Sequence, residues 1–190
     1  MKTLWDLIKR KPRQPAPEPP AAPAAPKPAA RPQAHARTAR STSARPTMAQ
    51  RYEALTREML KTYDIRVRKW RTSMSGCAWE VHYASGRVSR LIEAPRPRGP
   101  MSCAIFLHEI GHHAIGFGRY RPRCLEEYHA WRYALEQMEL RGVKITDGVR
   151  KRMDESMRYA VDKARRRGLK VLPPELERWG GCRANERMSE

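Results

Sequence analysis

Proline is concentrated at the N-terminal end of this chain. The sequence has 190 residues, and 10 of its 16 prolines lie within 1–46, where Ala, Arg, Lys and Ser supply most of the remainder. Such a stretch cannot bury enough apolar surface to offset the entropy of its chain. We therefore predict a disordered, basic, Pro/Ala-rich tail over 1–46 and one folded domain over 47–172. A loosely ordered tail is predicted for 173–190, after the pair Pro173-Pro174.

Positive charge is also densest in the N-terminal tail. The formal net charge is +19, of which 1–50 contribute +8, 51–100 contribute +6 and 101–190 contribute +5. Such an excess attracts nucleic acid without sequence preference, so weak non-specific contact through the tail is expected. No nucleic-acid-binding motif accompanies the charge, and the charge alone therefore indicates little beyond solubility.

The apolar segments and the cysteines bear on the compartment. No segment has the apolar length of a membrane span, and the N-terminus lacks the apolar core of a signal peptide. The cysteines are widely separated and form no CxxC pair, which is typical of free thiols in a reducing compartment. They are Cys77, Cys103, Cys124 and Cys182. These features predict a cytoplasmic protein and leave its oligomeric state open.

The spacing of apolar residues predicts four helices and three strands. Thr47 and Gln50 match a capping box at the start of a helix over 48–63. Alternating patterns predict three short strands, which we expect to form an antiparallel meander. The predicted strands are 64–71, 77–84 and 87–93, and the later helices are 102–115, 123–141 and 147–167. This order predicts an α+β fold, with helices packed on one face of a small antiparallel sheet.

The predicted helix over 102–115 carries the run His108-Glu109-Ile110-Gly111-His112 within an apolar segment. Residues four apart lie on one face of a helix, so both imidazoles can reach one zinc ion. The carboxylate beside them can take a proton from metal-activated water and pass it to a leaving amine. The spacing therefore predicts His108 and His112 as zinc ligands and Glu109 as the general base.

A catalytic zinc site needs a third protein ligand, and the helix over 123–141 offers Glu126, Glu127 and His129. Glu127 shares its helix face with apolar and small residues, where a carboxylate is costly unless it is paired or bound to metal. The faces of Glu126 and His129 are mixed or polar. This pattern favours Glu127 and keeps Glu126 and His129 as alternatives. The apolar neighbours of Glu127 are Ala130, Trp131, Ala134 and Met138.

These two segments resemble those of the ImmA/IrrE-type zinc metallopeptidases. The run HEIGHH is followed by Glu127-Tyr128-His129-Ala130-Trp131-Arg132-Tyr133-Ala134, which is similar to the family pattern E-x-x-A-x-x-[FY]-A. The resemblance covers residues 50–140. It implies a minimal zincin-like fold of the gluzincin type, a protein or peptide substrate, and Glu127 as the third zinc ligand.

The expected function is therefore that of a zinc metalloendopeptidase. The alternative is a basic nucleic-acid-associated or protein-binding module without peptidase activity, either SprT-like or with a purely structural zinc. SprT-like proteins use a later histidine in a Gly-His-Gly setting, whereas His129 stands between Tyr and Ala.

Several further residues are predicted to surround the site. His113 is expected to support the ligands or to pack in the core, because it points away from His108 and His112. Oxyanion stabilisation or support of the ligands is a candidate role for Tyr120, Tyr128 and His129. The strand over 87–93 is a candidate edge to which an extended peptide could add.

Overall fold

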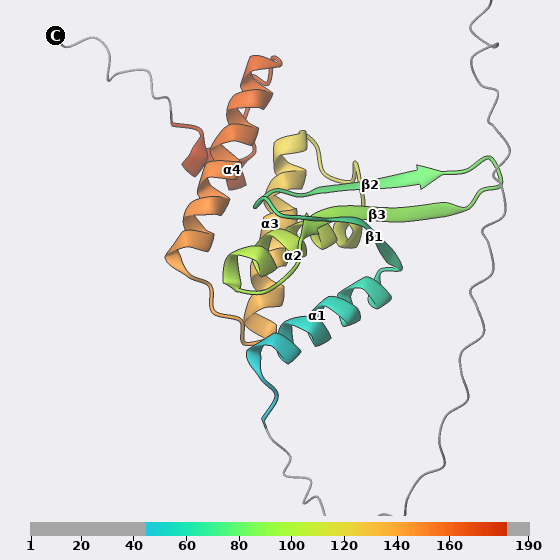
Figure 1. Cartoon of the computed structure of the whole chain (residues 1–190). Coiled ribbons are helices and arrows are strands. Elements are labelled where there is room, and N and C mark those ends of the chain that lie inside the picture. Colours follow the sequence, from blue (N-terminus) through green and yellow to red (C-terminus); the bar gives the residue numbers. More distant parts are fainter. Residues whose placement is uncertain (1–44, 182–190) are drawn as a thin grey trace, which may run out of the picture. The chain divides into compact units, whose positions relative to one another are not determined.

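The computed structural model describes residues 45–181, which form an α+β domain (Figure 1). Its elements are α1 (Met48–Thr62), β1 (Ile65–Arg71), β2 (Cys77–His82), β3 (Val88–Pro95), α2 (Pro100–Ile115), α3 (Arg123–Leu140), α4 (Asp147–Arg166) and the 3-10 helix η2 (Pro174–Trp179). The predicted α+β class is confirmed, and each predicted helix and strand is present. Disorder is predicted for residues 1–46. Of these, residues 1–44 lie outside the described part of the chain.

The start of α1 follows its sequence signal. Thr47 Oγ1 accepts a hydrogen bond from the Gln50 backbone N–H at 3.3 Å, and the Gln50 side chain accepts one from the Thr47 N–H at 2.8 Å. Two N–H groups at the helix end, where no intrahelical acceptor is available, are thereby paired. The predicted capping box is confirmed, and it directs the apolar face of α1 into the core through Tyr52, Leu55 and Met59.

The sheet differs from the predicted antiparallel meander. Its strand order is β1-β3-β2, with β3 antiparallel to β2 but parallel to β1. The prediction was wrong because it paired strands that are neighbours in sequence. β3 carries Ile92 and Ala94, which are fully buried, whereas β2 has no buried residue. The apolar β3 therefore takes the central position and leaves half-exposed β2 at an edge.

This strand order sends the chain across the end of β3. Residues 72–76 leave β1 and pass over β3 to begin β2 on its far side, a span of about 9.6 Å between strands. The same end of the sheet faces α4 (Figure 1), where the Met74 carbonyl accepts a hydrogen bond from Arg152 at 3.1 Å. In a meander, this loop would have joined two adjacent strands and would not have crossed β3.

α2 is the central helix of the domain. Every residue from Ser102 to His113 is buried, because the sheet, α1, α3 and α4 surround the helix. Gly111 allows the closest approach of α3, since a Cβ at this position would lie 2.8 Å from the Ala130 carbonyl oxygen. The glycine inside the helix therefore sets the distance between the two helices that carry the predicted ligands.

The C-terminal segment is more ordered than the sequence indicates. η2 packs against α4 and α3, and its Leu176 and Trp179 are buried. Trp179 Nε1 donates a hydrogen bond to Asp154 on α4 at 2.9 Å. The prediction of a loosely ordered tail is therefore wrong for residues 174–179, because two large apolar side chains within a short polar stretch are enough to anchor it. Residues 182–190 lie outside the described part of the chain.

Candidate metal centre

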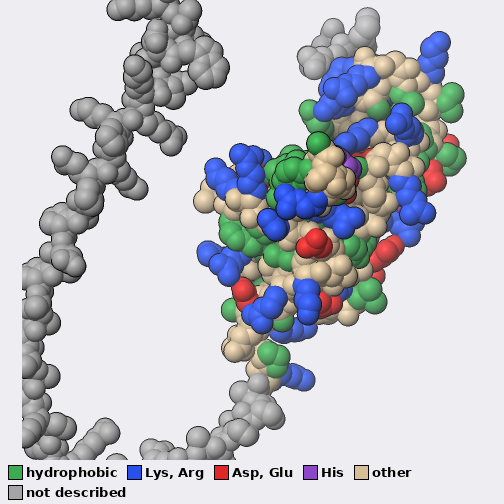
Figure 2. Space-filling view, turned by 90° about the vertical axis from the view of Figure 1, so that its right-hand side faces the viewer, with side chains coloured by type: hydrophobic (Ala, Val, Ile, Leu, Met, Phe, Trp, Pro, Cys, Tyr) green, Lys and Arg blue, Asp and Glu red, His purple; other side chains and the backbone are tan. Residues whose placement is uncertain are grey.

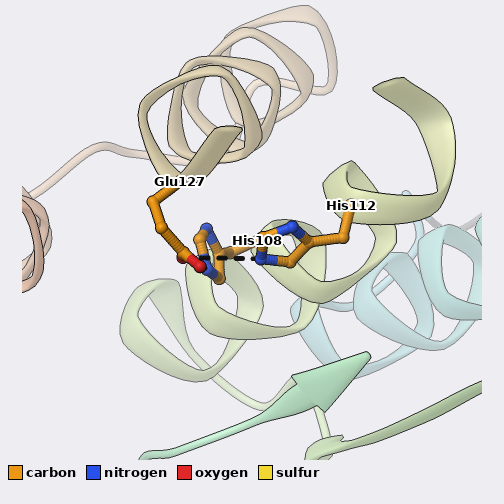
Figure 3. A group of neighbouring side chains, drawn as sticks. All are labelled: His108, His112 and Glu127. Carbon is orange, nitrogen blue, oxygen red and sulfur yellow. Dashed lines mark ion pairs between the residues drawn. The ribbon is translucent and has the colours of Figure 1, made fainter. Parts of the chain in front are cut away.

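His108, His112 and Glu127 meet between α2 and α3, as predicted (Figure 3). One helical turn separates the two histidines, and their rings point toward the carboxylate that extends from α3. Glu127 Oε2 lies 3.4 Å from His108 Nε2 and 3.5 Å from His112 Nε2. Three ligand atoms from two helices thus lie within 4.8 Å of one another and could hold a metal ion.

The two distances from Glu127 to the histidines fit a shared cation. Donors at 2.0–2.1 Å from a tetrahedral ion lie about 3.4 Å apart, whereas a direct charge-assisted hydrogen bond is about 2.7–2.9 Å long. The observed 3.4 and 3.5 Å match the first distance. The second oxygen of Glu127 accepts from Arg123 Nε at 3.2 Å, which leaves one oxygen free to face the histidines.

Glu126 lies behind His112 instead of among the three ligand atoms. Its Oε1 is 3.5 Å from His112 Nδ1, and its Oε2 accepts a hydrogen bond from the Gly118 N–H at 2.8 Å. A carboxylate at Nδ1 favours the tautomer that keeps its proton there and presents the Nε2 lone pair to a metal. Glu126, only 2 % exposed, is therefore placed to orient the candidate ligand His112.

The charges of the group are strongly coupled. Burial lowers the pKa of His108 to about 4. Burial also acts to lower the pKa of His112, but Glu126 and Glu127 outweigh it and raise that pKa to about 9. Although burial opposes it, the two histidines hold the pKa of Glu127 below its ordinary value. The carboxylates thus attract a positive charge to the position where a metal cation would lie.

Glu109 lies next to the group and is 5 % exposed. Burial raises its pKa to about 7. Its carboxylate packs against the backbone of the 72–76 loop, so closely that a Cβ at Gly76 would lie 2.6 Å from Glu109 Cδ. The loop that crosses the end of β3 therefore packs against the side chain of Glu109, and a Cβ at residue 76 would force that side chain to shift.

A cavity of about 920 Å³ opens beside the group. Its wall includes His108, Glu109 and Glu127, together with residues of the 72–76 loop and one face of α4. The cavity is large enough for several residues of an extended ligand. A molecule bound in it would lie against both the candidate metal ligands and Glu109.

The other predicted residues lie apart from this cavity. His113 Nε2 is 3.1 Å from the Leu91 carbonyl oxygen, which agrees with a supporting role in the core. The ring of His129 stacks on that of Tyr120 at 3.8 Å, and Tyr128 contacts Trp179. None of Tyr120, Tyr128 and His129 lines the cavity with Glu109, and His129 is not a member of the metal-ligand group.

The predicted peptide-binding edge at 87–93 is wrong, because β3 pairs with a strand on each side. The sequence analysis also missed Gly76 and Arg152, both of which line the cavity. Gly76 gives only the signal of a turn, and Arg152 that of a solvated helix face. No local pattern marks either residue as part of the cavity, because the crossing of the 72–76 loop brings Gly76 there and the packing of α4 brings Arg152.

Two further features of the described residues and the outcome of the comparisons with known proteins complete the description. Cys77, Cys103 and Cys124 are free thiols. No helix within 45–181 is long and apolar enough to cross a membrane. No protein-family model, curated protein or solved structure matched the chain in the three comparisons.

Proposed function

We propose that this protein is a zinc metallopeptidase that cleaves peptide bonds within the 920 Å³ cavity. The observation that carries the proposal is the placement of a buried carboxylate, Glu109, beside three converging ligand atoms in one cavity. Two imidazole nitrogens and one carboxylate oxygen are a ligand set that suits Zn²⁺. The resemblance of HEIGHH and the Glu127 segment to ImmA/IrrE-type metallopeptidases supports the same proposal.

In this proposal, His108, His112 and Glu127 hold the zinc, and Glu126 keeps His112 in the tautomer that can bind it. Bound Zn²⁺ would polarise the peptide carbonyl and lower the pKa of water. The Glu109 carboxylate accepts a proton from the attacking water and donates it to the leaving amine. Burial, which raises the pKa of this carboxyl group, favours its role as a proton acceptor.

The arrangement favours a catalytic site over a structural one. Structural zinc sites are closed by four protein ligands, whereas the group within residues 45–181 has three members and borders a cavity. A structural site also has no use for a base beside the metal. These features speak against the alternative of a nucleic-acid-associated module with a structural zinc.

The proposal is tested by incubating the purified, zinc-loaded full chain with a peptide library made by digesting whole proteomes. We expect new peptide ends to appear, to be suppressed by a chelator, and to return when zinc is added back. Mass spectrometry of labelled N-termini provides the measurement. A chain that holds about one zinc but produces no new ends would contradict the peptidase proposal.

A second prediction concerns the loop that holds Glu109. Gly76→Ala forces the Glu109 carboxylate to move, because the added methyl group would overlap it. A displacement of about 1 Å at a catalytic group can reduce the rate by about 10²-fold. We therefore expect kcat/KM to fall about 10²-fold, with zinc content unchanged, when library-derived peptides are used as substrates.

Gly181→Ala is the matched control, since a Cβ there meets nothing within 4 Å. This variant should cleave at the wild-type rate. Wild-type activity in Gly76→Ala would show that the loop does not position Glu109.

A further inference from the structure

α4 forms one wall of the cavity, and this wall carries several positively charged side chains. Arg152, Ser156, Tyr159, Lys163 and Arg167 all line the cavity and recur at intervals of three or four residues. This spacing places them on one face of the helix, along its length. Three of the five are cations, so positive charge runs along the cavity from the candidate metal centre to the end of α4.

These three cations have no acidic partner in the described chain. Within residues 45–181, neither Arg152, Lys163 nor Arg167 forms an ion pair with a carboxylate. The ion pairs there instead involve eight other basic side chains and three histidines. Arg123, which lines the cavity from α3, is paired with Glu126 and Glu127. The basic side chains without an acidic partner therefore lie on the α4 side of the cavity.

Arg152 is fixed in the cavity wall. One guanidinium nitrogen donates to the Met74 carbonyl at 3.1 Å, across the cavity from α4 to the 72–76 loop. Its Nε is buried and has no hydrogen-bond partner among the described residues. The Arg152 side chain is therefore a fixed part of the cavity wall, held by its contact with the 72–76 loop.

We infer that the cavity selects peptides that carry an acidic side chain several residues away from the scissile bond, with Lys163 and Arg167 attracting the carboxylate and Arg152 lining the wall nearer the metal centre. Lys163 lies about 16 Å from Arg152 along α4, at 1.5 Å per residue. The inference rests on the proposed peptidase function and names its substrate class. A carboxylate is the peptide group that complements unpaired cations, and charged acceptors make the stronger hydrogen bonds to them.

A peptide fits this cavity better than a nucleic acid does. Ile105, Trp131 and Leu169 also line it, which suits apolar side chains flanking an acidic one. Glu109 and Glu127 lie in the same wall as His108. A phosphate backbone would bring repeated negative charges close to these carboxylates, whereas a peptide places a single charge opposite α4.

The test must separate the cavity from the general charge of the molecule. Figure 2 shows Lys and Arg side chains spread over one face of the domain, with few acidic ones. Such charge attracts any acidic peptide. We therefore compare Lys163→Glu/Arg167→Glu with Arg165→Glu/Arg166→Glu, a control that changes the net charge equally at the same exposed helix end but outside the cavity.

Binding is measured in the zinc-loaded full chain with Glu109→Gln added to each protein, so that no peptide is cleaved. The probes are short, fluorescent, Ala-based peptides that carry Glu or Gln at one scanned position. We expect the Glu peptide to bind the Glu109→Gln protein and the Arg165→Glu/Arg166→Glu control roughly fivefold to tenfold more tightly than the Gln peptide. In Lys163→Glu/Arg167→Glu the Glu peptide should bind no more tightly than the Gln peptide, because the reversed charge repels it.

Equal binding of Glu and Gln peptides to the Glu109→Gln protein would overturn the inference, as would a preference for Glu that persists in Lys163→Glu/Arg167→Glu. A single-stranded oligonucleotide is run in parallel. If it alone loses affinity in Lys163→Glu/Arg167→Glu, the cavity is a nucleic-acid groove and the inference fails. If the Glu preference holds but chains with intact Glu109 cleave none of the peptides, the peptidase proposal fails and the ligand class stands.

Discussion

Replacing Glu109 by Gln is expected to lower kcat/KM for peptide cleavage by about 10²- to 10⁴-fold, because a positioned general base contributes a factor of this size. Glutamine has nearly the same shape as glutamate, so it fits against Gly76 in the space that the carboxylate fills. It cannot accept the proton that the carboxylate accepts. The loss should therefore appear in kcat, with the zinc content and the thermal stability close to those of the wild-type chain.

The matched control is Glu136→Gln, which makes the same chemical change on the exposed surface of α3, where Glu136 pairs with Arg132. This variant should retain wild-type activity. Both proteins are measured by cleavage kinetics on one library-derived peptide and by metal analysis. If Glu109→Gln cleaves as fast as the wild-type chain with its zinc in place, the centre has no general base at this position and the proposed mechanism is wrong.

Removing His112 is expected to abolish metal binding. His112→Ala deletes one of three ligand atoms and also the partner of two carboxylates, Glu126 and Glu127. The remaining pair of ligands is too few for tight binding of zinc. Metal analysis should give about one zinc per wild-type chain and near none for the variant. Added zinc at 100 times its Kd should stabilise the wild-type fold by about 2.7 kcal/mol and the variant hardly at all.

His82→Ala serves as the control, because His82 lies exposed on β2 and pairs only with Glu80. This variant should bind zinc as the wild-type chain does. A wild-type chain that neither carries zinc after purification without chelators nor gains thermal stability when zinc is added would contradict the metal-site proposal. Comparison of the two histidine variants separates loss of the site from a general effect of removing an imidazole.

The helices and the candidate metal ligands were predictable because their signals are local. The interval between His108 and His112 is one helical turn, so any helix through this run brings both rings to one side. The predicted third ligand, Glu127, meets them in the structure. Its apolar and small neighbours on α3 predicted that it faces α2, although Glu126 is the more deeply buried of the two carboxylates. These inferences depend on helical geometry alone.

The sheet order and the α4 wall could not be predicted in this way. Pairing between strands depends on burial across the whole domain. The predicted meander placed β2 at the centre of the sheet, whereas the more apolar β3 lies there in the structure. Glu126 was predicted only as an alternative ligand, because its position beside His112 Nδ1 also depends on packing between helices. Its relation to His112 Nδ1 depends on how far the helices approach at Gly111.

The sequence by itself therefore determined that His108, His112 and Glu127 could share a metal ion and that Glu109 stands beside them on α2, since these follow from positions along single helices. Only the tertiary structure decided what surrounds them. The crossing of the 72–76 loop places Gly76 against Glu109 and ties Met74 to Arg152. Contacts between segments far apart in sequence create the cavity and its unpaired cations, and no periodic pattern within one segment encodes such contacts.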